Sequence, residues 1–283
     1  MATSTLLARE KLLETARTLP AAPQVLAALG ELLQDVNADI AEVGDLIKRD
    51  AALTARVIRM GNSAVFGGGG VGSLDEAVGR VGFGEIYRIV GAAATASLAD
   101  RALAFYGIEA EALRESLLFH AIASEEVAQT AGLDVRPAYT AGLLRALGMM
   151  VLDRVARERL SAAEAFDPAR HTGYVMWEGI SFGLSNAEVA SMILSDWRFP
   201  AEVVAGVREH LLLRSSDFGS RLACVLNVAG ALAAETGRAL PGDRAYWALE
   251  PRRLEIVGLS ADDARAAGER AQHQFERLRL ALA

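Results

Sequence analysis

The sequence has few of the residues that most often carry out chemistry, with one cysteine and four histidines in 283 residues. Its cysteine, Cys224, lies in an apolar run and has no second cysteine to pair with, so we expect a small buried side chain there. No apolar run is long enough to cross a bilayer, and residues 1–10 lack the basic start and apolar core of an export signal. We therefore expect a cytoplasmic protein that does not contact a membrane.

Positive charge is also in short supply. The chain has 29 lysines and arginines against 36 aspartates and glutamates, which gives a formal net charge of −7. Non-specific binding to nucleic acid depends on an excess of cations, so a nucleic-acid partner is not expected. Hydrophobic residues make up 52% of the chain, which excludes a disordered protein and allows one large or two modest domains.

Strand patterns are nearly absent, whereas apolar residues recur at spacings of three and four almost everywhere, which predicts an all-α fold. Residues 73–76 and 185–188 match the capping box that starts a helix, and Pro200 suits a first helical turn. Asp50 is the expected N-cap of a helix that runs to about residue 62. A final amphipathic helix is expected from about residue 260.

Familiar catalytic motifs are missing or lack their context. Gly67, Gly69 and Gly72 satisfy the G-x-G-x-x-G pattern of dinucleotide-binding proteins, but a helical stretch precedes them instead of a strand. An interhelical loop is the better interpretation. No two histidines have the spacing that would place two metal ligands on one helix face, and His120 lies in an apolar segment typical of a core histidine.

One segment of the chain resembles the hallmark motif of a known family. Residues 50–63 read DAALTARVIRMGNS and are similar to D-P-x-L-t-x-x-l-L-r-x-x-N-S, the hallmark of the HDOD family, which is the HD-related output domain of bacterial signalling proteins. Further similar segments follow the family order: LPAAP at 19–23, SLDEAVGRVG at 73–82, AGLL at 141–144, EVA at 188–190 and WRFP at 197–200. The positions that carry the motifs are expected to be structural: Asp50, Leu53, Asn62, Ser63, Trp197 and Pro200.

This resemblance implies an HD-domain-like multi-helix bundle. It covers residues 19–212 and thereby suggests three parts. Residues 1–18 form a helical lead-in, residues 19–212 form the HDOD domain, and residues 213–283 form a helical extension packed on the same body. In that extension, residues 240–249 contain two aromatic side chains after a turn, and they are interpreted as a helix start packed on the core or as a docking patch.

The family resembles metal-dependent phosphohydrolases, whose histidine and aspartate ligands are largely replaced here. Arg145 and Ala146 stand where the paired His-Asp ligands would lie, and Asn186 stands where related sequences often have histidine. Gly230 is near the position of the terminal aspartate, and His210 alone matches an expected histidine. The first ligand would fall near Glu115 or Ser116. The candidate vestigial pocket therefore contains Glu115, Ser116, His120, Arg145, Ala146, Asn186 and His210.

A cationic arginine disfavours a divalent metal, so neither a metal nor another cofactor is expected. An internal or surface salt bridge is the favoured role of Arg145, with Asp153 or Glu188 as candidate partners, and an anion contact is the alternative. We therefore predict a non-catalytic regulatory module that contacts other signalling proteins, with a homodimer as one arrangement. The alternatives are a cryptic phosphohydrolase that uses His210 and His120, and a nucleotide sensor that uses Arg145 and Asn186.

Overall fold

The computed structural model describes residues 8–19, 25, 28–30, 32, 39–48, 51–64 and 68–282. Regular structure in these ranges is helical, and the β-type pairing found among them is an isolated bridge between Leu103 and Ile108. The predicted all-α fold is confirmed. No helix among the described residues has both the length and the apolar character needed to cross a lipid bilayer.

The chain forms two compact units, which are described separately. The larger unit contains residues 1–19 and 99–272, and the smaller unit contains residues 20–98 and 273–283. The helices of the larger unit are α1 (Arg9–Ala16), α7 (Ala110–Thr130), α8 (Val135–Leu144), α9 (Leu147–Arg159), α10 (Tyr174–Phe182), α11 (Asn186–Asp196), α12 (Ala201–Glu209), α13 (Arg221–Glu235), α14 (Pro251–Val257) and most of α15 (Ala261–Leu282). Three short 3₁₀ helices, η2 (Ala162–Glu164), η3 (Ser215–Gly219) and η4 (Arg244–Tyr246), connect them.

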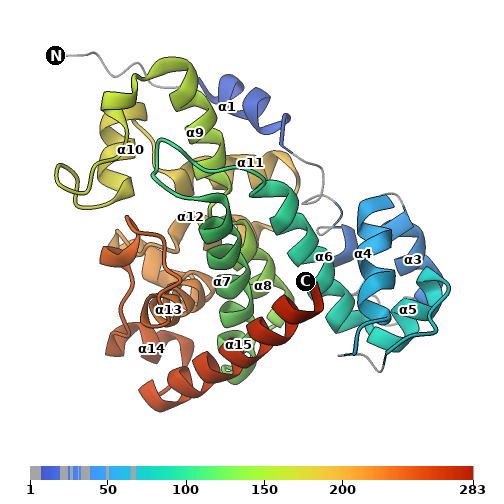
Figure 1. Ribbon diagram of the computed structural model, residues 1–283. Coiled ribbons are helices and arrows are strands. Elements are labelled where there is room, and N and C mark those ends of the chain that lie inside the picture. The colour runs from blue at the N-terminus through green and yellow to red at the C-terminus, as the bar shows by residue number, and fades with distance from the viewer. Residues whose placement is uncertain are drawn as a thin grey trace. The chain divides into compact units, whose positions relative to one another are not determined.

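The core of the larger unit is built around α7, which packs against α8 and α13 (Figure 1). All residues of α7 from Ser116 to Ala128 are buried, as expected for a helix that is enclosed on every side. Helix α13 is similarly enclosed and is buried from Leu222 to Ala233, including Cys224, which is a free and buried cysteine as predicted. The candidate site lies where these central helices meet.

Two glycines allow helices to approach one another closely in this core. A Cβ at Gly142 of α8 would lie 2.9 Å from the Cα of Ala121 on α7. At Gly148 of α9 the approach is closer still, since a Cβ would lie 1.9 Å from the backbone oxygen of Asn186 on α11. The glycines of the segments AGLL (141–144) and LG (147–148) therefore allow the backbones of neighbouring helices to lie in contact.

Gly148→Ala is expected to destabilise the larger unit by about 3 kcal/mol, because the added methyl group meets rigid backbone and forces α9 and α11 apart. Gly179→Ala on α10 is the matched control, since a Cβ there has no atom within 4 Å. Urea unfolding followed by circular dichroism measures both variants. Equal stability of the two would show that the α9–α11 contact is looser than described.

The smaller unit contains α3 (Ile40–Lys48), α4 (Ala51–Gly61), α5 (Leu74–Val81) and α6 (Phe83–Leu98). In the loop after α4, the Asn62 side-chain oxygen accepts a hydrogen bond from the backbone nitrogen of Val71 at 2.9 Å. Its side-chain nitrogen donates to the Val71 oxygen at 3.0 Å. Leu53 is buried in α4 and Ser63 is half-buried beside Asn62. Asn62 thus joins the two ends of the loop between α4 and α5, which is the interhelical loop that we predicted. Gly67 lies outside the described residues.

Local start signals agree with the structure in most places. Both halves of the capping box form at Ser185 and Glu188, whereas Ser73 caps α5 through the backbone nitrogen of Glu76 only. Pro200 is the N-cap of α12 and not a residue of its first turn, and the half-buried Trp197 is the C-cap of α11. Asp50 and the segment 20–23 lie outside the described residues. The predicted C-terminal helix is α15.

Candidate functional site

Arg145 is fully enclosed at the junction of α8 and α9, where it is the C-cap residue of α8. Its Nη1 donates to Oδ2 of Asp243 at 2.9 Å, and its Nη2 donates to the Ser116 hydroxyl of α7 at 3.2 Å. The side chains of Arg145 and Asp243 are only 2% and 3% exposed. A buried guanidinium needs such a partner, because an unpaired charge in the core is strongly unfavourable.

Trp247 covers this ion pair from the C-terminal segment. The guanidinium carbon of Arg145 lies 5.6 Å from the centre of the indole, and the rings of His120 and His210 each lie 5.7 Å from it. Gly230 of α13 makes room for the ring, since a Cβ there would lie 2.5 Å from indole carbons. We call these residues the Trp247 cluster: Ser116, His120, Arg145, His210, Asp243 and Trp247.

Burial and the neighbouring cation keep both histidines of the cluster neutral. Burial, followed by the Arg145 charge, lowers the pKa of His210 to about 3, although the hydrogen bond with the Val207 backbone opposes the fall. Burial followed by the charges of Arg145 and His210 holds the pKa of His120 well below its usual range. The His210 Nδ1 is paired with the Val207 carbonyl oxygen at 2.6 Å. At neutral pH the formal charges of the cluster are therefore those of Arg145 and Asp243.

A second buried network joins α10 to α11. The Glu178 carboxylate accepts hydrogen bonds from the Tyr106 hydroxyl at 2.8 Å, from the Asn186 backbone nitrogen at 2.7 Å and from the Asn186 side-chain nitrogen at 2.9 Å. Burial raises the pKa of Glu178 to about 7, and Asp243 adds to this rise, although the three donors oppose it. The three residues form what we call the Glu178 network.

The Glu178 network is expected to make stability depend on pH. Between the ordinary value of 4.5 and about 7, the folded chain binds a proton at Glu178 that the unfolded chain releases. The stabilising contribution of this proton is therefore complete below pH 4.5 and is lost as the pH rises to 7. Relative to Glu178→Gln, the wild-type free energy of unfolding should fall by about 2–3 kcal/mol over this window.

Chemical unfolding at a series of pH values measures this difference, and using the difference cancels the contributions of other titrating groups. Glu202→Gln, at an exposed position of α12, is the control variant. A difference that stays constant with pH would show that Glu178 is ionised throughout and would contradict the prediction.

The structure brings together four of the seven candidate residues, namely Ser116, His120, Arg145 and His210. Ala146 is buried beside them as the N-cap of α9. Asn186 belongs to the Glu178 network, and the half-buried Glu115 makes no hydrogen bond or ion pair to Arg145 or Asp243 in the described structure.

The expected internal salt bridge of Arg145 forms, but the partners that the sequence suggested are wrong. Asp153 instead accepts from the Phe105 backbone nitrogen and pairs with Arg157, both at 2.8 Å. Glu188 closes the capping box of α11 and pairs with Arg214 at 3.5 Å. Each carboxylate is held by groups near its own helix, which leaves Asp243 as the partner that reaches the buried guanidinium.

Sequence reasoning missed Asp243, Glu178 and Tyr106 and left the role of Trp247 open. Asp243 and Trp247 lie in the segment 240–249, which packs on the core, so the docking-patch interpretation of that segment is wrong. The apolar residues of this segment were the only sign in the sequence that Trp247 would be buried. Nothing comparable marks Glu178, whose partner Tyr106 lies 72 residues away.

The residues of the Trp247 cluster do not fit a divalent metal. Asp243 is already paired with a cation, and that cation would repel a metal at the same place. In the part of the chain that the structure describes, no three histidine, cysteine, aspartate or glutamate side chains are grouped so that they could hold a metal ion. The Trp247 cluster therefore differs from a hydrolase site in the side chains that would have to bind the metal.

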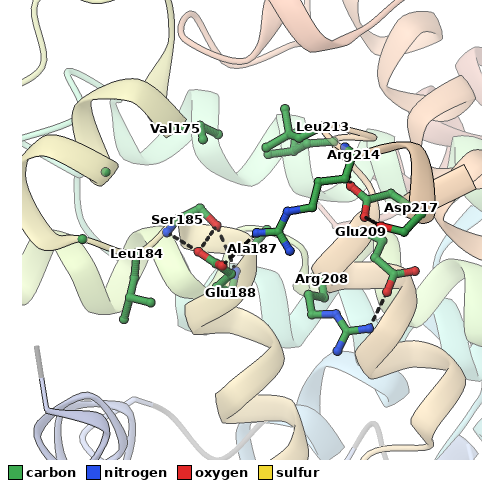
Figure 2. Close-up of a pocket in the computed structure, with 14 residues that line it drawn as sticks. Val175, Leu184, Ser185, Ala187, Glu188, Arg208, Glu209, Leu213, Arg214 and Asp217 are labelled. Atoms are coloured by element: carbon green, nitrogen blue, oxygen red, sulfur yellow. Dashed lines mark hydrogen bonds and ion pairs between the residues drawn. The ribbon is translucent and has the colours of Figure 1, made fainter. Parts of the chain in front are cut away.

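An open pocket of about 450 Å³ lies elsewhere in the larger unit, between α10, the start of α11 and the chain after α12. Figure 2 shows Val175 and Leu213 on one side, Ser185 and Glu188 on another, and Arg214 reaching across towards Glu188. None of the seven candidate residues lines it. It was not anticipated from the sequence.

Comparison with known proteins assigns the fold to a family. The family model described as HDOD domain matches residues 19–212, which is more than half of the chain. The chain belongs to the HDOD family. Asp243 and Trp247, which complete the Trp247 cluster, both lie beyond the matched region of this HDOD protein.

Solved structures with the same fold share little sequence with this HDOD protein. A proposed phosphohydrolase from Shewanella amazonensis SB2B is 24% identical, with a TM-score of 0.67 and coverage of 96% of this chain and 98% of that one. A proposed signal transduction protein from Marinobacter aquaeolei VT8 is 18% identical, with a TM-score of 0.67 and coverage of 99% and 67%. An HDOD domain protein of unknown function from Geobacter sulfurreducens is 19% identical, with a TM-score of 0.63 and coverage of 96% and 97%. No curated protein matches the sequence.

Proposed function

We propose that this HDOD protein is a non-catalytic regulatory module of bacterial signal transduction, and that it acts through contacts with other signalling proteins. The observation that carries the proposal is the buried Arg145–Asp243 ion pair under Trp247. The sequence resemblance implies that Arg145 stands at the position of a metal ligand in related hydrolases. A protein whose central site is filled by its own side chains can still act through contacts that its surface makes with other proteins.

The chemistry of the site supports this proposal. Metal-dependent phosphoester hydrolysis needs ligands that neutralise a dication and an open position for a water molecule. Here Arg145 contributes a positive charge, and His120 and His210 pack against the indole instead of facing open space. Trp247 is 7% exposed, so the side chain that covers the pair is itself buried.

The comparisons support the signalling role at the level of the family. The Marinobacter structure that shares this fold is described as a signal transduction protein. The Shewanella structure is described as a phosphohydrolase, which makes hydrolysis the alternative function to test.

The proposal is tested by measuring bound metal and turnover on the purified full-length chain. We expect sub-stoichiometric divalent metal by elemental analysis, and no hydrolysis of cyclic or linear dinucleotides with added Mg²⁺ or Mn²⁺. Arg145→Asp, which introduces a carboxylate at the expected ligand position, should not create activity, because Trp247 and Asp243 still fill the space.

Stoichiometric metal together with turnover that His210→Ala abolishes would overturn the proposal in favour of a phosphohydrolase. Calorimetric titration with cyclic dinucleotides separates the third possibility. Binding heat that is lost in Arg145→Met would indicate a nucleotide sensor, whereas we expect no heat.

A further inference from the structure

We propose that the pocket between α10, α11 and the chain after α12 is a docking site for a short linear segment of a partner protein, one that carries an aliphatic side chain beside acidic residues. The inference rests on the proposed role as a protein-contact module and specifies where that contact is made. It concerns the 450 Å³ pocket of Figure 2 and not the Trp247 cluster.

The pocket has the size and the apolar walls that an inserted side chain needs. Its volume of about 450 Å³ lies within the range of roughly 300–1,000 Å³ that is common for ligand pockets. Val175, Leu211 and Leu213 supply apolar wall. Gly179 of α10 is an exposed lining residue, and a Cβ at that position would have no atom within 4 Å, so a larger side chain can be placed there without a clash.

Exposed apolar side chains occur on the elements that border the pocket. Leu213, at the rim, is 51% exposed. Met176 and Ile180, on the face of α10 next to the one that lines the pocket, are 45% and 59% exposed. Exposed apolar side chains of this size are typical of interaction surfaces.

Backbone geometry turns Leu213 outwards. Leu212 adopts a φ of 52°, in the left-handed region that residues other than glycine seldom occupy. The chain therefore leaves α12 in a new direction, with Leu211 and Leu212 buried and Leu213 exposed. A strained residue at this point holds an apolar side chain in water at the mouth of the pocket.

The more exposed charges at the rim are positive, although the carboxylates of Glu188, Glu209 and the buried Asp217 also line the pocket. The side chains of Arg208 and Arg214 are 53% and 74% exposed, whereas those of their partners Glu209 and Glu188 are 17% and 34% exposed. Each guanidinium has five N–H donors, so one local ion pair leaves donors that face solvent. Carboxylates match this geometry, often in bidentate fashion, which is why the partner segment is acidic.

The probe for this site is a phage library of random 12-residue peptides, panned on the full-length chain. The enriched sequence is then synthesised with a fluorophore, and its binding is measured by fluorescence anisotropy. We expect enriched peptides to combine an aliphatic residue with aspartate or glutamate. Their affinity should fall as salt concentration rises, because the ion pairs are exposed.

Two variants with matched controls locate the binding. Gly179→Leu adds a side chain at the pocket wall without a clash and should weaken binding about tenfold or more, whereas Gly84→Leu, at another exposed helical glycine with open space, should not.

The double variant Arg208→Glu, Arg214→Glu should lose binding to a similar extent. It should regain binding to a peptide whose acidic residues are replaced by lysine, and Arg101→Glu is its control, since Arg101 is also an exposed arginine paired with its sequence neighbour.

Absence of enriched peptides would overturn the inference, as would peptides whose binding Gly179→Leu leaves unchanged. Sedimentation equilibrium addresses a different occupant: self-association that Gly179→Leu abolishes would assign the pocket to a second copy of the chain and overturn the peptide inference. Metal-dependent turnover would overturn the proposed non-catalytic role, but it would leave these binding results as they stand, so the two failures are distinguishable.

Discussion

Replacing Asp243 with alanine is expected to lower the free energy of unfolding by about 3–5 kcal/mol, because the change leaves the Arg145 charge buried without its partner. The Ser116 hydroxyl, at 3.2 Å, is a neutral acceptor and cannot balance a full charge. Urea unfolding followed by circular dichroism measures the loss. Asp262→Ala is the matched control, since the Asp262–Arg265 pair is exposed and should contribute less than about 1 kcal/mol.

The double variant Arg145→Met, Asp243→Leu separates the effect of charge from that of packing. Both buried charges are then removed together, so most of the lost stability should return, to within about 1–2 kcal/mol of wild type. An Asp243→Ala variant as stable as Asp262→Ala would contradict the description of a dry, paired guanidinium. It would also weaken the case that this pair fills the former reaction centre.

Trp247→Ala is expected to cost about 3–5 kcal/mol, since it removes a large ring that contacts His120, His210 and Arg145. The space left behind is lined with polar groups, so water should enter it. With burial relieved, the pKa values of His120 and His210 should rise towards the ordinary value. Proton NMR titration of the two imidazole rings measures this rise, and Trp247→Phe, which keeps an aromatic ring, should show a smaller one.

Gly230 provides a test of direct contact with Trp247. Gly230→Ala should destabilise the wild-type chain, because the added Cβ would lie 2.5 Å from the indole, but it should be tolerated in the Trp247→Ala background. Equal effects in both backgrounds would show that the two residues do not touch. The same geometry explains why an aspartate at this position, as expected for a hydrolase, has no room here.

The parts of the fold that the sequence predicted depend on interactions within about four residues. The capping box of Ser185 and Glu188 and the helical periodicity are of this kind, since a helix start is satisfied by its own first turn. The displacement of Pro200 to the N-cap is a difference of one residue, within the usual uncertainty of a helix boundary.

The candidate site was predicted only in part, because its partners are distant in sequence. Family motifs located Arg145 and His210, but Asp243 lies 98 residues after Arg145. Asp153 and Glu188 were nearer candidates, but Asp153 is engaged by the Phe105 backbone nitrogen, 48 residues away, and Glu188 by the capping box of α11. The pocket beside α10 was missed for a related reason, since its lining comes from α10, the start of α11 and the chain after α12, which are up to about 40 residues apart in the sequence.

The Arg145–Asp243 pair also affects how this protein can evolve. A single substitution of Arg145 by a metal-binding histidine or aspartate would leave Asp243 without its cation, and Trp247 would still fill the space in which a ligand must lie. Introducing a metal site here would therefore need changes at several positions, some of them beyond residue 212, and each single substitution would leave a buried charge unpaired. The ion pair thus makes the residues allowed at position 145 depend on the residue at position 243.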